Sequence, residues 1–177
     1  MKMITLVPLV GKPDSGKTKT ILAFFGYDPD GRISPNKTYE RVINGKQVFC
    51  IGVASVQELS FQKKREKKFS DEEWVQYLIE RIELKINRCR RECKCSDFIL
   101  ITPFTVYKDR SGNIRTYLID GPINHFHNNG HDIHVVTLLK ASDTEQYLVD
   151  LGEHMIISNM EWQRQANELE AFIRKII

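Results

Sequence analysis

Near its amino terminus the chain contains the segment Gly11-Lys12-Pro13-Asp14-Ser15-Gly16-Lys17-Thr18. It fits the pattern G-x-x-x-x-G-K-[ST], in which a glycine-rich loop surrounds phosphate groups. A continuous apolar run at residues 3–10 precedes the loop, and a helix-like stretch at residues 17–25 follows it. Because the pattern binds phosphate when it joins a buried strand to a helix, the segment predicts a nucleotide site.

The residue types in this loop match the chemistry of phosphate recognition. Glycine lets the backbone adopt conformations in which successive N–H groups point at phosphate oxygens, and the following helix adds its positive end. We expect Lys17 to face ligand and solvent and to reach the β- and γ-phosphates, while the Thr18 hydroxyl ligates Mg²⁺. The alternative to a phosphate-binding loop is a structural glycine-rich turn that contains a lysine by chance. The predicted nucleotide contacts are Gly11, Asp14, Ser15, Gly16, Lys17 and Thr18.

Composition predicts one domain over residues 1–177 and narrows the choice of partners. The chain has 177 residues, of which 41% are hydrophobic and 28% charged, as expected of a single core. A net charge of +3 is too mild to predict a nucleic-acid partner. Nowhere does an apolar stretch approach the roughly 20 residues that span a bilayer. The amino-terminal run also lacks the features of a signal peptide. We therefore expect a soluble cytoplasmic protein with no membrane partner.

Hydrophobic periodicity predicts alternating strands and helices. A hairpin is expected around Asn44-Gly45, and a long helix after Ser70, which resembles an N-cap. The stretch from 113 to 130 stays open between helix and loop. The pattern predicts a three-layer α/β/α domain whose sheet is mostly parallel, with one antiparallel hairpin strand. The predicted strands are residues 3–10, 39–43, 47–54, 98–106, 133–139 and 155–157, and the predicted helices are 17–25, 71–91, 142–152 and 161–177.

This order of elements resembles that of a small Ras-like GTPase, a class of P-loop NTPase, over nearly the whole chain. Only the phosphate loop matches that family residue by residue. The resemblance implies a D-x-x-G motif after the hairpin, but residues 52–58 contain no aspartate, which leaves Ser55 or Glu58 as substitutes. It also implies a glutamine that orients the attacking water, and Gln57 lies near that position. Lys17 and Gln57 are thus the catalytic candidates.

The resemblance implies two further groups of ligand contacts. Guanine recognition in the family uses [NT]-K-x-D, and here Lys140 and Asp143 are present but one residue too far apart. The base, guanine or adenine, therefore stays open. In the turn-rich loop at residues 27–37 and just after it, Ser34 or Thr38 is the candidate for a second Mg²⁺ hydroxyl.

Three functions follow from the loop. The favoured one is a GTPase-like switch or slow hydrolase that uses Mg²⁺ with GTP or ATP and presents residues 27–37 and 55–68 to a protein effector. The second is a P-loop kinase that transfers phosphate to a small acceptor, with Arg110 and Arg115 as candidate lid residues. The third is a non-hydrolysing nucleotide-binding scaffold, which the missing acidic motif favours.

Two other groups of residues could either bind a ligand or have an ordinary structural role. The first, His125, His127, His131 and His134, is dense enough to suggest a metal site but also fits a polar loop that enters a strand. The second comprises the basic residues at 63–68 and near the end of the long helix. These suggest phosphate-backbone contacts, although such runs are more often solvated.

Four cysteines give no clear metal motif. Cys50 lies in an apolar run and predicts a core position, whereas Cys89, Cys93 and Cys95 crowd one basic segment. The spacing lacks a C-x-x-C pair, which argues against zinc. In a cytoplasmic protein we expect free thiols.

Overall fold

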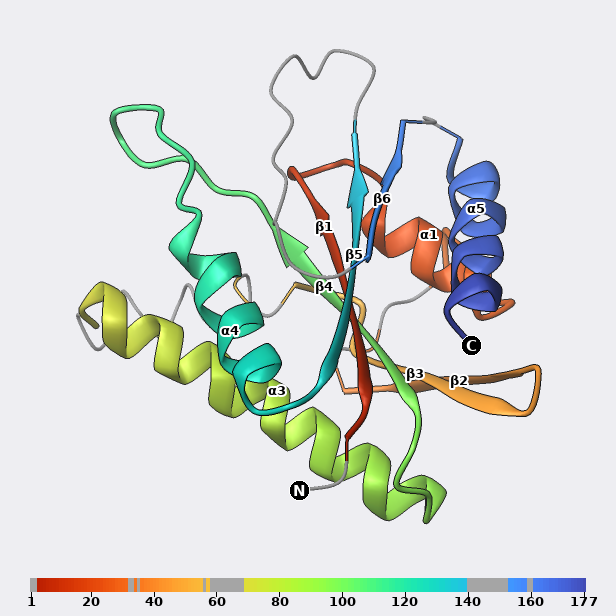
Figure 1. Ribbon diagram of the computed structural model, residues 1–177. Helices are drawn as coiled ribbons and strands as arrows, with labels where there is room; N and C mark the ends of the chain where they lie inside the picture. The colour runs from red at the N-terminus through yellow and green to blue at the C-terminus, as the bar shows by residue number, and fades with distance from the viewer. Residues whose placement is uncertain are drawn as a thin grey trace.

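A six-stranded sheet runs through the middle of the molecule and carries helices on both faces (Figure 1). The computed structural model describes residues 3–31, 34, 36–55, 57, 69–139, 153–158 and 161–177. The sheet order is β2-β3-β4-β1-β5-β6, and only the β2–β3 pair is antiparallel. This confirms the predicted α/β class and its mostly parallel sheet. The strands are β1 (Thr5–Gly11), β2 (Thr38–Ile43), β3 (Lys46–Ile51), β4 (Ile99–Thr105), β5 (Asp132–Leu138) and β6 (Glu153–Ile157).

The helices form one layer on each side of this sheet. On one side lie α1 (Lys17–Phe24) and α5 (Trp162–Ile176), and on the other α3 (Asp71–Cys93) and α4 (Tyr117–Asn128) (Figure 1). Side chains of strand β4 pack against the helices on both faces of the sheet. Its Leu100 and Phe104 pack with α3 and α4, whereas Ile101 packs with α1 and α5. A strand covered on both faces needs a continuous apolar run, which is why its sequence does not alternate with polar residues.

Local turn and cap chemistry explains where several elements begin and end. Asn44 and Gly45 both have positive φ, 50° and 80°, as a tight two-residue hairpin requires. At the start of α3, the Ser70 Oγ accepts from the Glu73 N–H at 3.2 Å, and the Glu73 carboxylate accepts from the Ser70 N–H at 2.7 Å. This capping box satisfies two donors that a helix start leaves unpaired. The predicted hairpin and helix cap are both confirmed.

The sequence left residues 113–130 open between helix and loop. In the structure most of this stretch is the helix α4, which contains Pro122. Proline has no N–H for the carbonyl four residues earlier, which belongs to Leu118. That carbonyl instead accepts from the Gln57 Nε2 at 3.4 Å, so a residue distant in sequence supplies the hydrogen-bond donor that the helix lacks. The short helix predicted at residues 142–152 lies outside the described residues.

One expectation about the cysteines was wrong. Cys93, the last residue of α3, forms a disulfide with Cys95, whereas we expected free thiols. Cys50 and Cys89 are free thiols, and both are buried. The core position predicted for Cys50 is confirmed. In the part of the chain that the structure describes, no helix is long and apolar enough to cross a membrane.

Candidate functional site

The glycine-rich loop joins the carboxyl end of β1 to the first turn of α1. Its path requires left-handed backbone at Asp14, with φ 58°, and at Gly16, with φ 88°. The Ser15 N–H donates to the Lys12 carbonyl at 3.2 Å and closes the turn. A Cβ on Gly16 would lie 2.8 Å from the Gln165 Oε1, and one on Gly11 would collide with the Ser15 side chain. Both glycines of the motif are therefore needed for conformation or close packing.

Lys17 lies inside this loop and is only 7% exposed, so the expectation that it faces solvent was wrong. Its Nζ donates to the carbonyls of Gly11 and Lys12, each at 2.8 Å, and contacts the Ser15 Oγ at 3.4 Å. The loop itself thus holds the ammonium group at the start of α1. A positive charge there adds to the positive end of the helix and favours an anion.

A cavity of about 560 Å³ opens beside the loop. It is walled by the loop and the first turn of α1, by the segment after β3 and by the start of α5. Thr18 is half-buried in this wall, and Ser55, which the sequence offered as a substitute for the missing aspartate, is 2% exposed. The described lining residues are Asp14, Ser15, Gly16, Lys17, Thr18, Lys19, Pro29, Val53, Ser55 and Trp162.

The sheet order explains how Ser55 reaches this cavity. Strand β4 lies between β3 and β1, so the end of β3 is two strands away from the glycine loop, or about 10 Å. The segment after β3 crosses that gap. Among the described lining residues, Asp14 has the only carboxylate. The described lining of the segment after β3 therefore offers a hydroxyl group where the GTPase resemblance implied an acid, and Glu58, the other candidate substitute, lies outside the described residues.

Sequence reasoning missed the residue that connects α5 to the loop, Gln165, which is 1% exposed. Its Oε1 accepts from the Thr20 Oγ1 at 2.6 Å, and its Nε2 donates to the Ser15 carbonyl at 3.3 Å. A glutamine on the otherwise apolar face of the final helix was the available signal, since buried polar groups need hydrogen-bond partners. Trp162, one turn earlier on the same helix, lines the cavity.

Gln57 does not line the cavity of the glycine loop. Its side chain is fully buried, with its Oε1 accepting from the Thr105 N–H at 3.1 Å and its Nε2 donating to Leu118. These contacts bridge the end of β4 to α4. A glutamine that orients water would have to give up both contacts, so this position of Gln57 does not support a catalytic role.

Ser34 and Thr38, the candidates for a second Mg²⁺ hydroxyl, are not among the described residues that line the cavity. Ser34 is exposed, and its carbonyl accepts from the Lys37 N–H at 3.2 Å. Thr38 begins β2, opposite Ile51. Lys140 and Asp143, the candidates for base recognition, lie outside the described residues.

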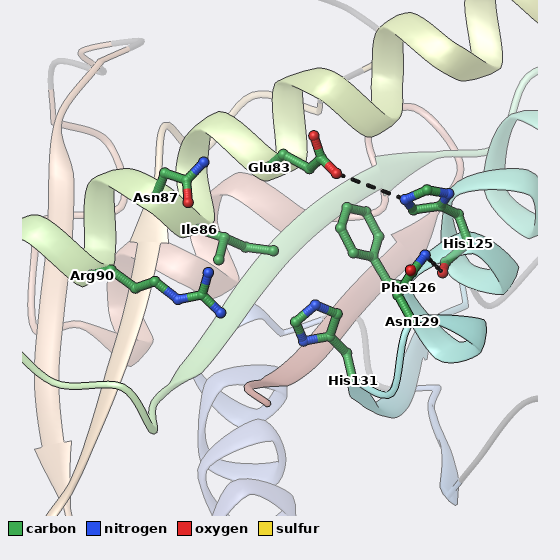
Figure 2. A pocket seen from close by; sticks show the side chains of 8 residues that line it. All are labelled: Glu83, Ile86, Asn87, Arg90, His125, Phe126, Asn129 and His131. Atoms are coloured by element: carbon green, nitrogen blue, oxygen red, sulfur yellow. Dashed lines mark hydrogen bonds and ion pairs between the residues drawn. The ribbon is translucent and has the colours of Figure 1, made fainter. Parts of the chain in front are cut away.

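The histidines separate onto different surfaces. His134 contacts Asp132 at 2.8 Å beside the ring of Phe172, whereas His125 and His131 line a smaller cavity of about 200 Å³ between α3 and α4 (Figure 2). There the Glu83 carboxylate lies 3.8 Å from the His125 Nε2. Over the described residues, no group of three or more His, Cys, Asp or Glu is arranged to hold a metal ion.

His131 has a structural contact in this second cavity. Its Nδ1 accepts from the Ile4 N–H at 3.3 Å, just before β1 begins. Burial, and then the nearby Arg90 guanidinium, lower the pKa of His131, which favours the neutral ring that this contact requires. The histidine therefore positions the start of β1 at the end of the sheet opposite the glycine loop.

Comparison of the chain with protein-family models, with curated proteins and with solved structures finds no match.

Proposed function

We propose that the protein binds a nucleoside triphosphate with Mg²⁺ in the cavity beside residues 11–18. The observation that carries this proposal is the loop itself, with its left-handed turns at Asp14 and Gly16 and with Lys17 buried against its carbonyls. Such a loop presents backbone N–H groups and one ammonium group to an anion at a helix start. A cavity of about 560 Å³ lies within the range of about 300–1,000 Å³ that small-molecule sites occupy.

The described residues fit a magnesium ion that is held largely by the nucleotide. Mg²⁺ prefers oxygen ligands, retains several waters and is usually bound through substrate phosphates and a few protein groups. Thr18 would supply the first protein oxygen, and Ser55 lines the same cavity as a second hydroxyl. Bound there, the metal would neutralise charge on the phosphates. A neutral hydroxyl in place of a carboxylate supports weak metal binding and slow hydrolysis.

The favoured function is therefore a GTPase-like switch or slow hydrolase, and the other two hypotheses become outcomes of the test. The kinase alternative has less support, because the guanidinium of Arg115 lies 5.9 Å from the Trp74 ring on the α3 side of the sheet. The scaffold alternative differs from the favoured function only in turnover. Release of phosphate, or its transfer to an added acceptor, would separate the three.

Lys17→Ala is expected to lower affinity for triphosphates by 100-fold or more, equivalent to about 2.7 kcal/mol, because it removes the cation that the loop holds. The measurement is a titration with fluorescent GTP and ATP analogues, with and without Mg²⁺. Thermal unfolding must accompany it, since Lys17 is buried. Lys12→Ala is the matched control, because it removes the same charge from the same loop at a position that does not line the cavity.

Equal affinity in folded Lys17→Ala and in the parent protein would overturn the proposal. If Lys17→Ala lowers affinity as expected, a product assay on the tighter-binding nucleotide distinguishes a hydrolase from a scaffold. Thr18→Ala should leave Mg²⁺-free binding nearly unchanged and reduce the gain in affinity that Mg²⁺ provides.

A further inference from the structure

We propose that Trp162 is the platform on which the base of a purine nucleotide stacks. This inference rests on the proposed function and adds to it the class of nucleotide. Trp162 is the first residue of α5 and is half-buried. It lines the same cavity as Lys17 and Thr18, and it is the only aromatic residue in the described part of that lining.

The position of Trp162 relative to the loop is held by hydrogen bonds one helical turn away. Residues three apart lie on the same face of a helix, so Trp162 and Gln165 face the same side of α5. The buried Gln165 amide donates to Ser15 in the loop and accepts from Thr20 in α1. Because both contacts reach the phosphate-binding elements, the start of α5 is fixed against the loop, and the indole has a defined place in the cavity wall.

The chemistry of the cavity lining divides into two parts that match the two ends of a nucleotide. The loop amides and the Lys17 ammonium suit phosphate oxygens. Trp162, Pro29 and Val53 provide the apolar surface that a base requires. Lys19, at the rim, is paired with Asp30 at 2.6 Å and so is less available to the phosphates.

The size of the Trp162 indole determines which bases stack on it best. Two fused rings overlap more area with a purine than with the single ring of a pyrimidine, and stacking depends on that apolar overlap. Stacking does not read the hydrogen-bonding edge of a base. At this residue, ATP and GTP should therefore be preferred to CTP and UTP, with little discrimination between adenine and guanine.

The test compares nucleotides with inorganic tripolyphosphate, which contacts the loop but has no base. Trp162→Ala is expected to lower affinity for ATP and GTP by roughly 5- to 100-fold, the range that stacking on an aromatic side chain supports, and to leave tripolyphosphate affinity within about twofold. Trp162→Phe, which keeps an aromatic ring, should recover most of the lost affinity. Calorimetric titration of the three proteins with all five ligands measures this.

Fluorescence provides an independent readout, because the chain has two tryptophans in different surroundings. Trp74 of α3 is fully buried in the core, whereas Trp162 lines the cavity. ATP should quench the emission of the parent protein but not of Trp162→Phe, in which Trp74 remains and reports that the core is folded.

The outcomes separate the two proposals. Unchanged ATP and GTP affinity in Trp162→Ala, or an equal loss for nucleotides and tripolyphosphate, would overturn the role of Trp162 as a platform. Quenching that persists in Trp162→Phe would do the same. If the parent protein binds neither tripolyphosphate nor any nucleotide, the proposed function itself fails.

Discussion

At the residue scale, the most unusual side chain outside the nucleotide cavity is Lys85 of α3. It is only 7% exposed, and its Nζ has no hydrogen-bond partner among the described residues. Burial is the main cause that lowers the pKa of Lys85 from its ordinary value of 10.5. Nearby Cys50 opposes that shift and Arg81 reinforces it. The unfolded chain therefore holds this proton more tightly than the folded one, and folding is penalised at low pH.

Lys85→Met is expected to raise the free energy of unfolding at pH 7 by about 1–3 kcal/mol, the cost of an unsatisfied buried polar group. The gain should shrink as pH rises toward 10.5, where Lys85 also loses its proton in the unfolded state. Urea denaturation of both proteins at several pH values measures the difference. The parent and the variant must be compared at each pH, because both proteins also lose stability at high pH. The cause is Cys50 and Cys89, since burial raises the pKa of each thiol to about 12.

The exposed Lys175→Met is the matched control for the change of charge. A Lys85→Met protein that is less stable than the parent at pH 7 would mean that the amine has a favourable contact, and would contradict the prediction.

At the scale of elements, α4 depends on a side chain from outside the helix. Pro122 leaves the Leu118 carbonyl without its helical donor, and Gln57 replaces that donor while also accepting from the Thr105 N–H. Gln57→Ala should therefore destabilise the protein by about 2 kcal/mol or more, since it leaves two buried backbone groups unsatisfied. Pro122→Ala restores one helical N–H. The double variant should accordingly recover part of the loss, which a double-mutant cycle by urea denaturation measures.

Additive effects of the two substitutions would contradict this account of α4. If instead Gln57→Ala folds with parental stability and loses only phosphate release, the catalytic hypothesis from the sequence would be restored.

At the scale of the whole molecule, one ionic network connects the edge hairpin to the last helix. Glu170 of α5 pairs with Arg41 of β2 at 2.8 Å and with Arg174 at 2.7 Å, and Arg174 also donates to the Asn44 Oδ1 at 3.0 Å. Hydrogen bonding from Arg174, followed by that from Arg41, lowers the pKa of Glu170 below its ordinary value of 4.5. The network thus joins chain segments that lie far apart in sequence.

A carboxylate with a lowered pKa contributes stability above its unfolded value, and that contribution is lost as pH falls through the folded pKa. Glu170→Gln should therefore lower stability near pH 7 by up to about 1 kcal/mol, because the pair is partly exposed, and should flatten the acid limb below pH 4.5. Thermal unfolding between pH 7 and 3 tests this. Glu168→Gln on the same helix is the control, and an acid limb as steep in Glu170→Gln as in the parent would count against the prediction.

The features that could be predicted from the amino-acid sequence are local ones. The apolar run before Gly11, the Asn44-Gly45 turn and the Ser70 cap predicted a strand, a hairpin and a helix start, because each depends on a few adjacent residues. The same short range made the loop at 11–18 recognisable as a candidate phosphate site. Periodicity left the stretch at 113–130 open between helix and loop, because Pro122 lies inside α4 and the donor that compensates for it comes from another segment.

Which distant groups meet depends on the three-dimensional fold. It put β4 between β3 and β1, turned Gln57 toward α4, and brought Trp162 and Gln165 of the last helix to the loop near the start of the chain. It also buried Lys85, and it buried Lys17, which we expected to face ligand and solvent. The physical reason is that a buried polar group or an aromatic side chain acquires its partner from the packing of elements, and nothing in its own neighbourhood of sequence specifies that partner.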